Sequence, residues 1–173
     1  MRIIAAACLT SLLVYVFPAP VFAGSAGMSM TSPAFVRQGA IPKTYTCDGR
    51  NINPELVIRN VPVGAKSLVL IVEDPDAPAG VWTHWIVWNI RPSTRIIREG
   101  SSPAGAVQGT NDFQEQGYDG PCPPSGTHRY FFRLFALDTT LGLGPAAVKA
   151  TLENALHGHV LEQTLLAGRY TRR

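Results

Sequence analysis

The stretch that decides the fold reads Asp74-Pro-Asp-Ala-Pro-Ala-Gly-Val-Trp-Thr-His-Trp-Ile-Val-Trp-Asn-Ile90. It opens with two acids, Asp74 and Asp76, which are interleaved with Pro75 and Pro78. A proline fixes its own φ angle and pushes the residue before it toward extended geometry. We therefore expect both carboxylates to lie on a stiff, non-helical loop.

Apolar runs border this loop on both sides. Residues 68–72 precede it and residues 85–90 follow it, and runs of this length and composition indicate buried strands. His84 lies where the second strand begins. A rigid acidic loop between two buried strands, with a histidine at its exit, is typical of the rim of a pocket.

A second stretch has the same character, and it reads Gly120-Pro-Cys-Pro-Pro-Ser-Gly-Thr-His-Arg-Tyr130. It is a Pro/Gly loop that runs into an expected strand at residues 130–137. His128 and Tyr130 lie near the start of that strand, so both stretches bring polar side chains to strand ends.

The two stretches together resemble the phosphatidylethanolamine-binding protein family, in its bacterial Raf-kinase-inhibitor-like branch. The matching motifs are Asp74-Pro-Asp-Ala-Pro78, Trp82-Thr-His84, and Gly120-Pro-Cys-Pro-Pro with His128-Arg-Tyr130. Weaker matches, Tyr45-Thr-Cys-Asp-Gly49 and Asn53-Pro54, extend the resemblance over nearly all of the chain after residue 28. The resemblance implies a Greek-key β-sandwich with a small pocket that accepts the phosphoryl headgroup of phospholipids.

The residues themselves are compatible with such a pocket. Histidines donate hydrogen bonds and carry charge below about pH 6.5, and a tyrosine hydroxyl and loop amides add donors, which together suit a small anion. A carboxylate can orient one histidine through its second ring nitrogen. By the resemblance, the ligand-binding residues are Asp74, Asp76, Trp82, His84, Gly120, Pro121, His128 and Tyr130. The alternative is that Asp74 caps a turn and that both histidines are buried and hydrogen-bonded without a ligand.

Metal binding and catalysis are the rival chemical readings. Two histidines and a carboxylate could form a metal triad, but no His-x-His or His-x-x-x-His spacing supports one, so we expect no metal and no cofactor. A hydrolase could use Ser125, but Gly-x-Ser-x-Gly is absent and Pro123-Pro124 restrain the preceding loop. We therefore expect a protein that is not an enzyme.

The tryptophans divide between core and pocket if their strand is regular. Residues 82, 84, 86 and 88 then share one face, opposite residues 85 and 87. On this basis Trp85 is a core residue, whereas Trp82 is the better candidate for the pocket wall.

Composition and pattern set the fold class. The chain of 173 residues contains 14 prolines and 16 glycines, which favours one domain with many turns and short strands. Further strands are expected at residues 31–36, 41–47, 53–58 and 160–170. One helix is expected between Gly144-Pro145 and Gly158. These elements indicate a mainly β protein, an antiparallel β-sandwich. The family resemblance implies the same fold, with a few short peripheral helices.

The first residues read as a secretory signal peptide. Arg2 gives a positive start, residues 3–16 are almost continuously apolar, and Val21-Phe22-Ala23 ends in a small residue. We expect cleavage after Ala23, a flexible leader at residues 24–30 and a single domain at residues 31–173. The alternative is a retained membrane anchor, for which the apolar run is short. The protein is thus expected to be exported, periplasmic or secreted, with no stable membrane span after cleavage.

The cysteine count depends on that cleavage. Loss of Cys8 leaves Cys47 and Cys122, and an even number in an exported protein predicts one disulfide. The alternative of two free thiols stays open.

The leading functional prediction is a non-catalytic, exported binding protein for a phosphoryl headgroup or another small anion. The alternative is a protein-interaction module, such as a protease inhibitor or a modulator of an envelope or host partner. The net charge of +3 is small and scattered, which argues against nucleic acid. No long C-terminal helix is apparent that could cover the pocket, which leaves lipid binding open, and a homodimer also stays open.

Overall fold

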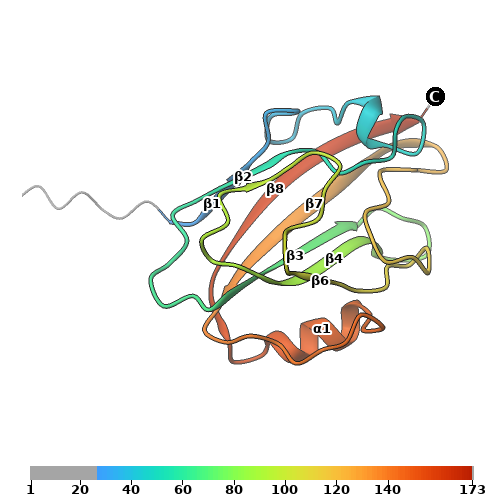
Figure 1. Ribbon diagram of the computed structural model, residues 1–173. Helices are drawn as coiled ribbons and strands as arrows, with labels where there is room; N and C mark the ends of the chain where they lie inside the picture. Colours follow the sequence, from blue (N-terminus) through green and yellow to red (C-terminus); the bar gives the residue numbers. More distant parts are fainter. Residues whose placement is uncertain (1–26, 173) are drawn as a thin grey trace, which may run out of the picture.

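The computed structural model describes residues 27–172 (Figure 1). The expected signal peptide, its cleavage site after Ala23 and residues 24–26 of the expected leader lie outside the described residues. Within the described part, no helix is long and apolar enough to cross a membrane.

Two antiparallel sheets form the molecule. The larger has the order β6-β4-β3-β7-β8, with β6 at Val107–Gln108, β4 at Trp82–Ile90, β3 at Ser67–Asp74, β7 at Gly126–Leu137 and β8 at Val160–Arg172. The smaller has the order β1-β2-β5, with β1 at Ser29–Thr31, β2 at Leu56–Arg59 and β5 at Ile96–Ile97. Side chains from both sheets share one core cluster, which confirms the expected antiparallel β-sandwich.

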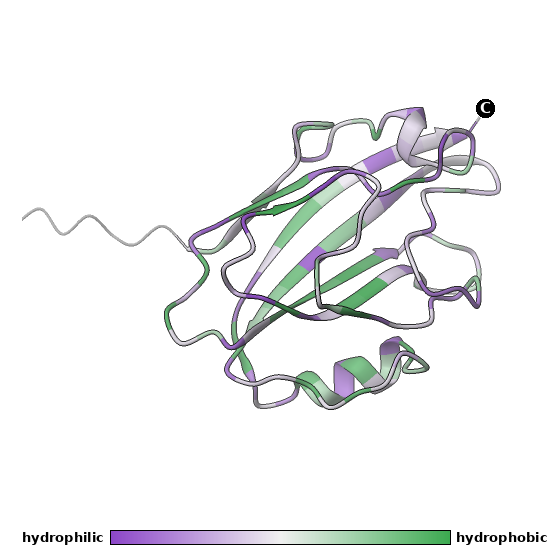
Figure 2. Cartoon of the chain, viewed as in Figure 1, coloured by the Kyte–Doolittle hydropathy of each residue, from purple (hydrophilic) through white to green (hydrophobic). Residues whose placement is uncertain are grey.

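Strand β3 is buried on both faces, which is why its sequence is continuously apolar. Leu68, Leu70 and Val72 point into the core between the sheets, whereas Val69 and Ile71 belong to a second cluster on the other face. In Figure 2, β3 is accordingly coloured as hydrophobic over most of its length. A strand with no solvated face has no reason to alternate polar and apolar residues.

The second cluster is covered by the helix α1, Lys149–Leu156. Figure 1 shows α1 on the side of the five-stranded sheet that faces away from β1 and β2. Leu152 and Leu156 are buried, while Val148 is 45% exposed. The helix begins later than expected because residues 144–147 form a turn, in which the Ala147 amide donates to Gly144 and the Ala147 carbonyl accepts from Thr110.

The start of the domain differs from expectation. Met28 and Met30 are buried in the core, and β1 pairs with β2 so that Met30 lies opposite Ile58. The expected flexible leader is therefore wrong for residues 28–30, since burial of two methionines fixes this segment. The expected strand at 31–36 is likewise reduced to its first residue.

The segment at residues 41–47 was expected to be a strand, and this is also wrong. It contains instead a short 3-10 helix, η1, at Lys43–Tyr45. The Thr46 amide and hydroxyl both bond to the Lys43 carbonyl, so local bonds replace pairing with a neighbouring strand. The other expected strands are present with shifted ends, including β2, which begins only at Leu56.

Candidate functional site

Asp74 ends β3 and lies almost fully buried, with 3% of its surface exposed. Its Oδ1 accepts the backbone N–H of Asp76 at 2.8 Å, and its Oδ2 accepts Nδ1–H of His128 at 2.7 Å. The carboxylate thus caps its own proline-containing turn and joins two strands at the same time. The turn-capping reading from the sequence is correct, and it coexists with a position at the cavity wall.

Strand β4 carries a bulge where it approaches Asp74. Val72 pairs with Trp85, but the next residue of β3, Glu73, pairs with Thr83, so His84 is the extra residue. Beyond the bulge Trp82 lies opposite Asp74, on the same face of the sheet as Trp85. The expected separation of Trp82 and Trp85 onto opposite faces is therefore wrong, although Trp85 is a core residue as predicted.

The ring of His84 has a fixed orientation. Nδ1 lies 2.6 Å from the carbonyl oxygen of Asp119, which can only accept, so Nδ1 carries the hydrogen. His84 is 2% exposed, and desolvation lowers its pKa below the usual value of 6.5 despite the bond to Asp119. The neutral ring therefore offers a lone pair at Nε2, which becomes a donor only on protonation.

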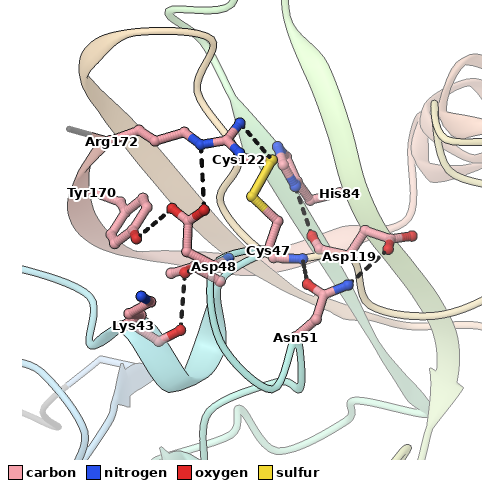
Figure 3. The surroundings of a disulfide bond; sticks show 11 residues. Lys43, Cys47, Asp48, Asn51, His84, Asp119, Cys122, Tyr170 and Arg172 are labelled. Atoms are coloured by element: carbon pink, nitrogen blue, oxygen red, sulfur yellow. Dashed lines mark hydrogen bonds and ion pairs between the residues drawn. A yellow bond between two sulfur atoms is a disulfide. The ribbon is translucent and has the colours of Figure 1, made fainter.

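A partly buried polar network holds the Asp119 carbonyl in place. Asn111 donates to Asp119 Oδ2 at 2.8 Å, and Asn51 donates to Oδ1 at 3.2 Å. The amide of Gly120 in turn donates to Asn51 Oδ1 at 2.7 Å. Figure 3 shows Asn51, Asp119 and His84 linked in this way. Sequence reasoning did not identify these three polar side chains.

A disulfide joins the segment that contains Asn51 to the loop that contains Gly120. Cys47 and Cys122 are bonded, with their Cα atoms 5.4 Å apart and 75 residues apart in sequence (Figure 3). Nη1 of Arg172 donates to Cys122 Sγ at 3.6 Å. The structure thus contains the disulfide that the cysteine count predicted, and Cys122 places it at the edge of the cavity.

The cavity itself has a volume of about 280 Å³. It is lined by Asp74, Ala77, Pro78, Ala79, Trp82, His84, Phe113, Cys122 and Pro124. Phe113 meets Trp82 and His84 edge-on, with ring centroids 5.5 and 5.3 Å away. Sequence reasoning missed Phe113, which directly follows Asn111 and Asp112 in the chain. Most of this wall is apolar, with Asp74 and His84 as the two titratable groups.

Three of the eight expected ligand-binding residues, Asp74, Trp82 and His84, line this cavity. His128 and Tyr130 lie behind Asp74 and His84, and His128 contacts Asp74 rather than the cavity. The Tyr130 hydroxyl is buried with no hydrogen bond to any residue of 27–172, and burial together with the Asp74 charge raises its pKa.

The remaining expected residues lie elsewhere. Gly120 and Pro121 are buried in loop contacts, where the Gly120 amide is already bonded to Asn51. Asp76 faces Arg129, which donates to it from Nε at 2.8 Å and from Nη2 at 2.6 Å. These bonds lower the pKa of the Asp76 carboxyl to about 2. Asp76 therefore braces the loop from outside and does not line the cavity.

The site offers one hydrogen-bonded carboxylate, one histidine nitrogen and an apolar, aromatic wall. Within residues 27–172 no three His, Cys, Asp or Glu side chains are grouped so that they could hold a metal ion. Such an arrangement can bind a small polar group, with a histidine whose charge depends on pH.

Comparisons with known proteins agree with the fold and its motifs. The family model described as phosphatidylethanolamine-binding protein matches residues 31–171. A UPF0098 protein of Methanothermobacter thermautotrophicus is 53% identical over 150 residues, covering 84% of this chain and 99% of its own length. A UPF0098 protein of Pyrococcus horikoshii is 47% identical over 159 residues, covering 87% and 80%.

Solved structures are similar as well. A phosphatidylethanolamine-binding protein homolog from Chlamydia trachomatis superposes with a TM-score of 0.82 at 44% identity, covering 85% of this chain and 99% of the other. Escherichia coli YbcL, described as a member of the mammalian family, superposes with a TM-score of 0.80 at 30% identity, covering 86% and 100%. The chain belongs to the phosphatidylethanolamine-binding protein family.

Proposed function

We propose that this chain is an exported, non-catalytic binding protein whose cavity at Asp74 and His84 holds a phosphoryl group or a similar small anion. The observation that carries the proposal is the position of His84. Its Nδ1–H is committed to Asp119, so Nε2 is the nitrogen left for a ligand in a largely apolar cavity of about 280 Å³. Protonation of Nε2 provides a charge-assisted donor at that point.

The carboxylate of Asp74 next to His84 is compatible with a bound anion. Both oxygens of Asp74 accept hydrogen bonds from the protein, which disperses its charge. A protonated phosphoryl oxygen can also donate a hydrogen bond to the neutral Nε2 of His84. The cavity can therefore accept the ligand with the proton on either partner.

The absence of catalysis is proposed from the same groups. Of the cavity residues, Asp74 and His84 are the ones that titrate, and each is already bound to a partner that fixes it. The sulfur of Cys122 is bonded to Cys47 and is not a free nucleophile. Binding rather than bond breaking is therefore the activity that this set supports.

Export is supported by two independent features. The first 23 residues have the pattern of a signal peptide. The Cys47–Cys122 bridge is of a kind that persists in oxidising compartments and is rare in the cytosol.

Titration calorimetry with phosphoethanolamine tests the proposed ligand. Replacing His84 by Gln removes one charge-assisted hydrogen bond and is expected to weaken binding by about ten- to a hundredfold. His159→Gln is the matched control, because His159 is exposed and bonds to Asp138 outside the cavity. Ethanolamine without phosphate is expected not to bind.

Equal affinities of the folded wild type and His84→Gln would contradict the proposal. Ethanolamine binding as tightly as phosphoethanolamine would do so too, because the cavity would then select a cation. A chain that binds neither compound but retains a protein partner in pull-down experiments would favour the interaction-module alternative.

A further inference from the structure

A second hollow, the arginine groove, lies on the outer face of the five-stranded sheet where α1 does not cover it. Its volume is about 390 Å³, larger than the cavity at Asp74. Its floor is apolar and its rim cationic: Phe131, Leu165 and Ala167 form the floor, and Arg37, Arg129 and Arg169 stand around it. None of these residues lines the cavity at Asp74.

The strand register concentrates positive charge at this groove. Arg129 of β7 lies directly opposite Arg169 of β8, and Phe131 lies opposite Ala167. Like charges directly opposite on antiparallel strands destabilise a sheet unless something compensates them. Arg37 adds a third guanidinium from the segment before η1.

Among residues 27–172, a carboxylate pairs with one of the three arginines. Asp76 binds Arg129 through two guanidinium nitrogens. Arg169 gives its Nε to the carbonyl of Gln38 at 2.9 Å, which carries no charge. Across residues 27–172, neither Arg37 nor Arg169 has a carboxylate within salt-bridge distance, and no acid lines the groove.

Backbone hydrogen bonds hold the segment at Gln38 and Gly39 against β8, where it forms one wall of the groove. The backbone N–H of Gln38 donates to the Ala167 carbonyl at 2.6 Å, and the backbone N–H of Arg169 donates to the Gly39 carbonyl at 2.9 Å. Gln38 adopts a left-handed backbone with φ of 60°, which is uncommon for a residue other than glycine. This conformation turns the Gln38 carbonyl toward Arg169, so the groove is formed before any ligand arrives.

We propose that the arginine groove binds a small organic anion, an acidic group carried on an apolar or aromatic body. The planar guanidinium groups of Arg37 and Arg169 suit a carboxylate, sulfonate or phosphoryl group, and the floor at Phe131 suits the apolar body. The volume falls in the range of small-molecule sites. This inference stands independently of the ligand proposed for the cavity at Asp74.

Naphthalene-1-sulfonate is a direct probe, because it combines one permanent negative charge with an aromatic body. Its binding to the mature chain is followed by calorimetry and by ligand-observed NMR. The expected result is saturable binding of the sulfonate, with much weaker binding of the neutral naphthalene-1-methanol and of inorganic sulfate. The His84→Gln variant is expected to bind the probe as tightly as the wild type, because His84 lines the other site.

The double variant Arg37→Gln/Arg169→Gln is expected to weaken binding of the probe by about tenfold or more, since two charge-assisted contacts are lost. The matched control is Arg91→Gln/Arg95→Gln, which removes the same charge from a loop outside the groove. Its affinity is expected to stay within about twofold of the wild type. Circular dichroism and thermal midpoints establish that each variant is folded.

Three outcomes would overturn the inference. Unchanged affinity in the folded Arg37→Gln/Arg169→Gln variant would remove the arginines from the site. An equal loss in both double variants would reduce the effect to general charge attraction. A loss of probe affinity in the folded His84→Gln variant would place the probe in the cavity at Asp74 instead.

Discussion

Single side chains at the cavity are set by partners that lie far away in the sequence. The tautomer of His84 follows from a carbonyl 35 residues away, and the position of the Asp74 carboxylate follows from a histidine 54 residues away. Both groups are more than nine-tenths buried, so each acts through the hydrogen bonds it makes and not through free contact with solvent. Two predictions belong to this scale.

The first concerns pH and His84. Desolvation lowers the His84 pKa below 6.5, and an anionic ligand favours the protonated ring. Ligand affinity is therefore expected to rise as pH falls toward that lowered pKa, and to level off below it, where the ring of the free protein is already protonated. A phosphomonoester has a second pKa of about 6, so its own charge changes in the same pH range. Glycerophosphoethanolamine, a diester of constant charge, is therefore the ligand for this measurement. Affinity that is flat with pH, or identical in His84→Gln at every pH, would rule out this role for His84.

The second concerns Asp74. Asp74→Asn replaces a carboxylate that accepts from Asp76 and His128, and bonds to charged groups contribute roughly 1.5–3 kcal/mol. The free energy of unfolding in urea is expected to fall by about 2 kcal/mol. Asp138→Asn is the control, because Asp138 is exposed and its bond to His159 contributes less than about 1 kcal/mol. A similar small loss in both variants would show that Asp74 does not hold its loop.

At the scale of elements, one bulge and one bridge shape the cavity. The extra residue in β4 brings Trp82 opposite Asp74, and the disulfide ties the segment after η1 to the loop before β7. On the other face, α1 closes the cluster beneath β3 and β4 and leaves the arginine groove open.

The Cys47–Cys122 disulfide is expected both to stabilise the fold and to be detectable as a covalent link. A bridge across 75 residues is expected to stabilise the fold by about 4 kcal/mol in the loop-entropy description. Reductant should lower the urea midpoint of the wild type but not that of Cys47→Ala/Cys122→Ala. Non-reducing mass spectrometry should show the linked peptide pair. Two alkylatable cysteines in the mature, oxidised protein would refute the bridge.

The helix prediction uses a matched pair of residues. Leu152 is fully buried beneath the sheet, and Leu152→Ala is expected to cost about 2–5 kcal/mol of unfolding free energy. Val148 precedes α1 with 45% exposure, so Val148→Ala is expected to cost less than about 0.5 kcal/mol. Equal losses in the two variants would mean that α1 does not cover the second cluster.

For the whole molecule, two hydrophobic clusters lie on either side of the five-stranded sheet, and the two proposed binding sites lie at separate places around it. The large sheet is thus the common support of both sites. Its β3 and β7 strands supply Asp74 to one and Arg129 to the other.

The prediction at this scale is export. N-terminal sequencing of protein recovered outside the cytoplasm is expected to begin at Gly24, after the Val21-Phe22-Ala23 sequence. Ala23→Arg should block processing, because cleavage requires a small residue at that position. Functional protein that retains Met1 would contradict the prediction.

Much of the fold could be predicted from the sequence because its signals are local. The apolar runs at β3 and β4 and the prolines around Asp74 act over a few residues, so their strands and loop were identified correctly. The segments at 28–36 and 41–47 were not, because their patterns are weak and burial or a turn bond decided them.

In the candidate site, too, the features with local sequence signals could be predicted and those that depend on distant contacts could not. The sequence predicted the family motifs and the strands that carry Asp74, Trp82 and His84, because these depend on residue identity and short spacing. The cysteine count favoured a bridge between Cys47 and Cys122 but left two free thiols open, and the structure contains the bridge.

The groups that face the cavity are set by contacts between distant segments. The tertiary structure placed Phe113 in the wall, turned Asp76 out to Arg129, and fixed the ring of His84 on Asp119. It also assembled the arginine groove from three separate segments. The physical reason is that a bulge reverses the face on which a side chain lies, and that hydrogen-bond partners distant in sequence meet only when the strands pair.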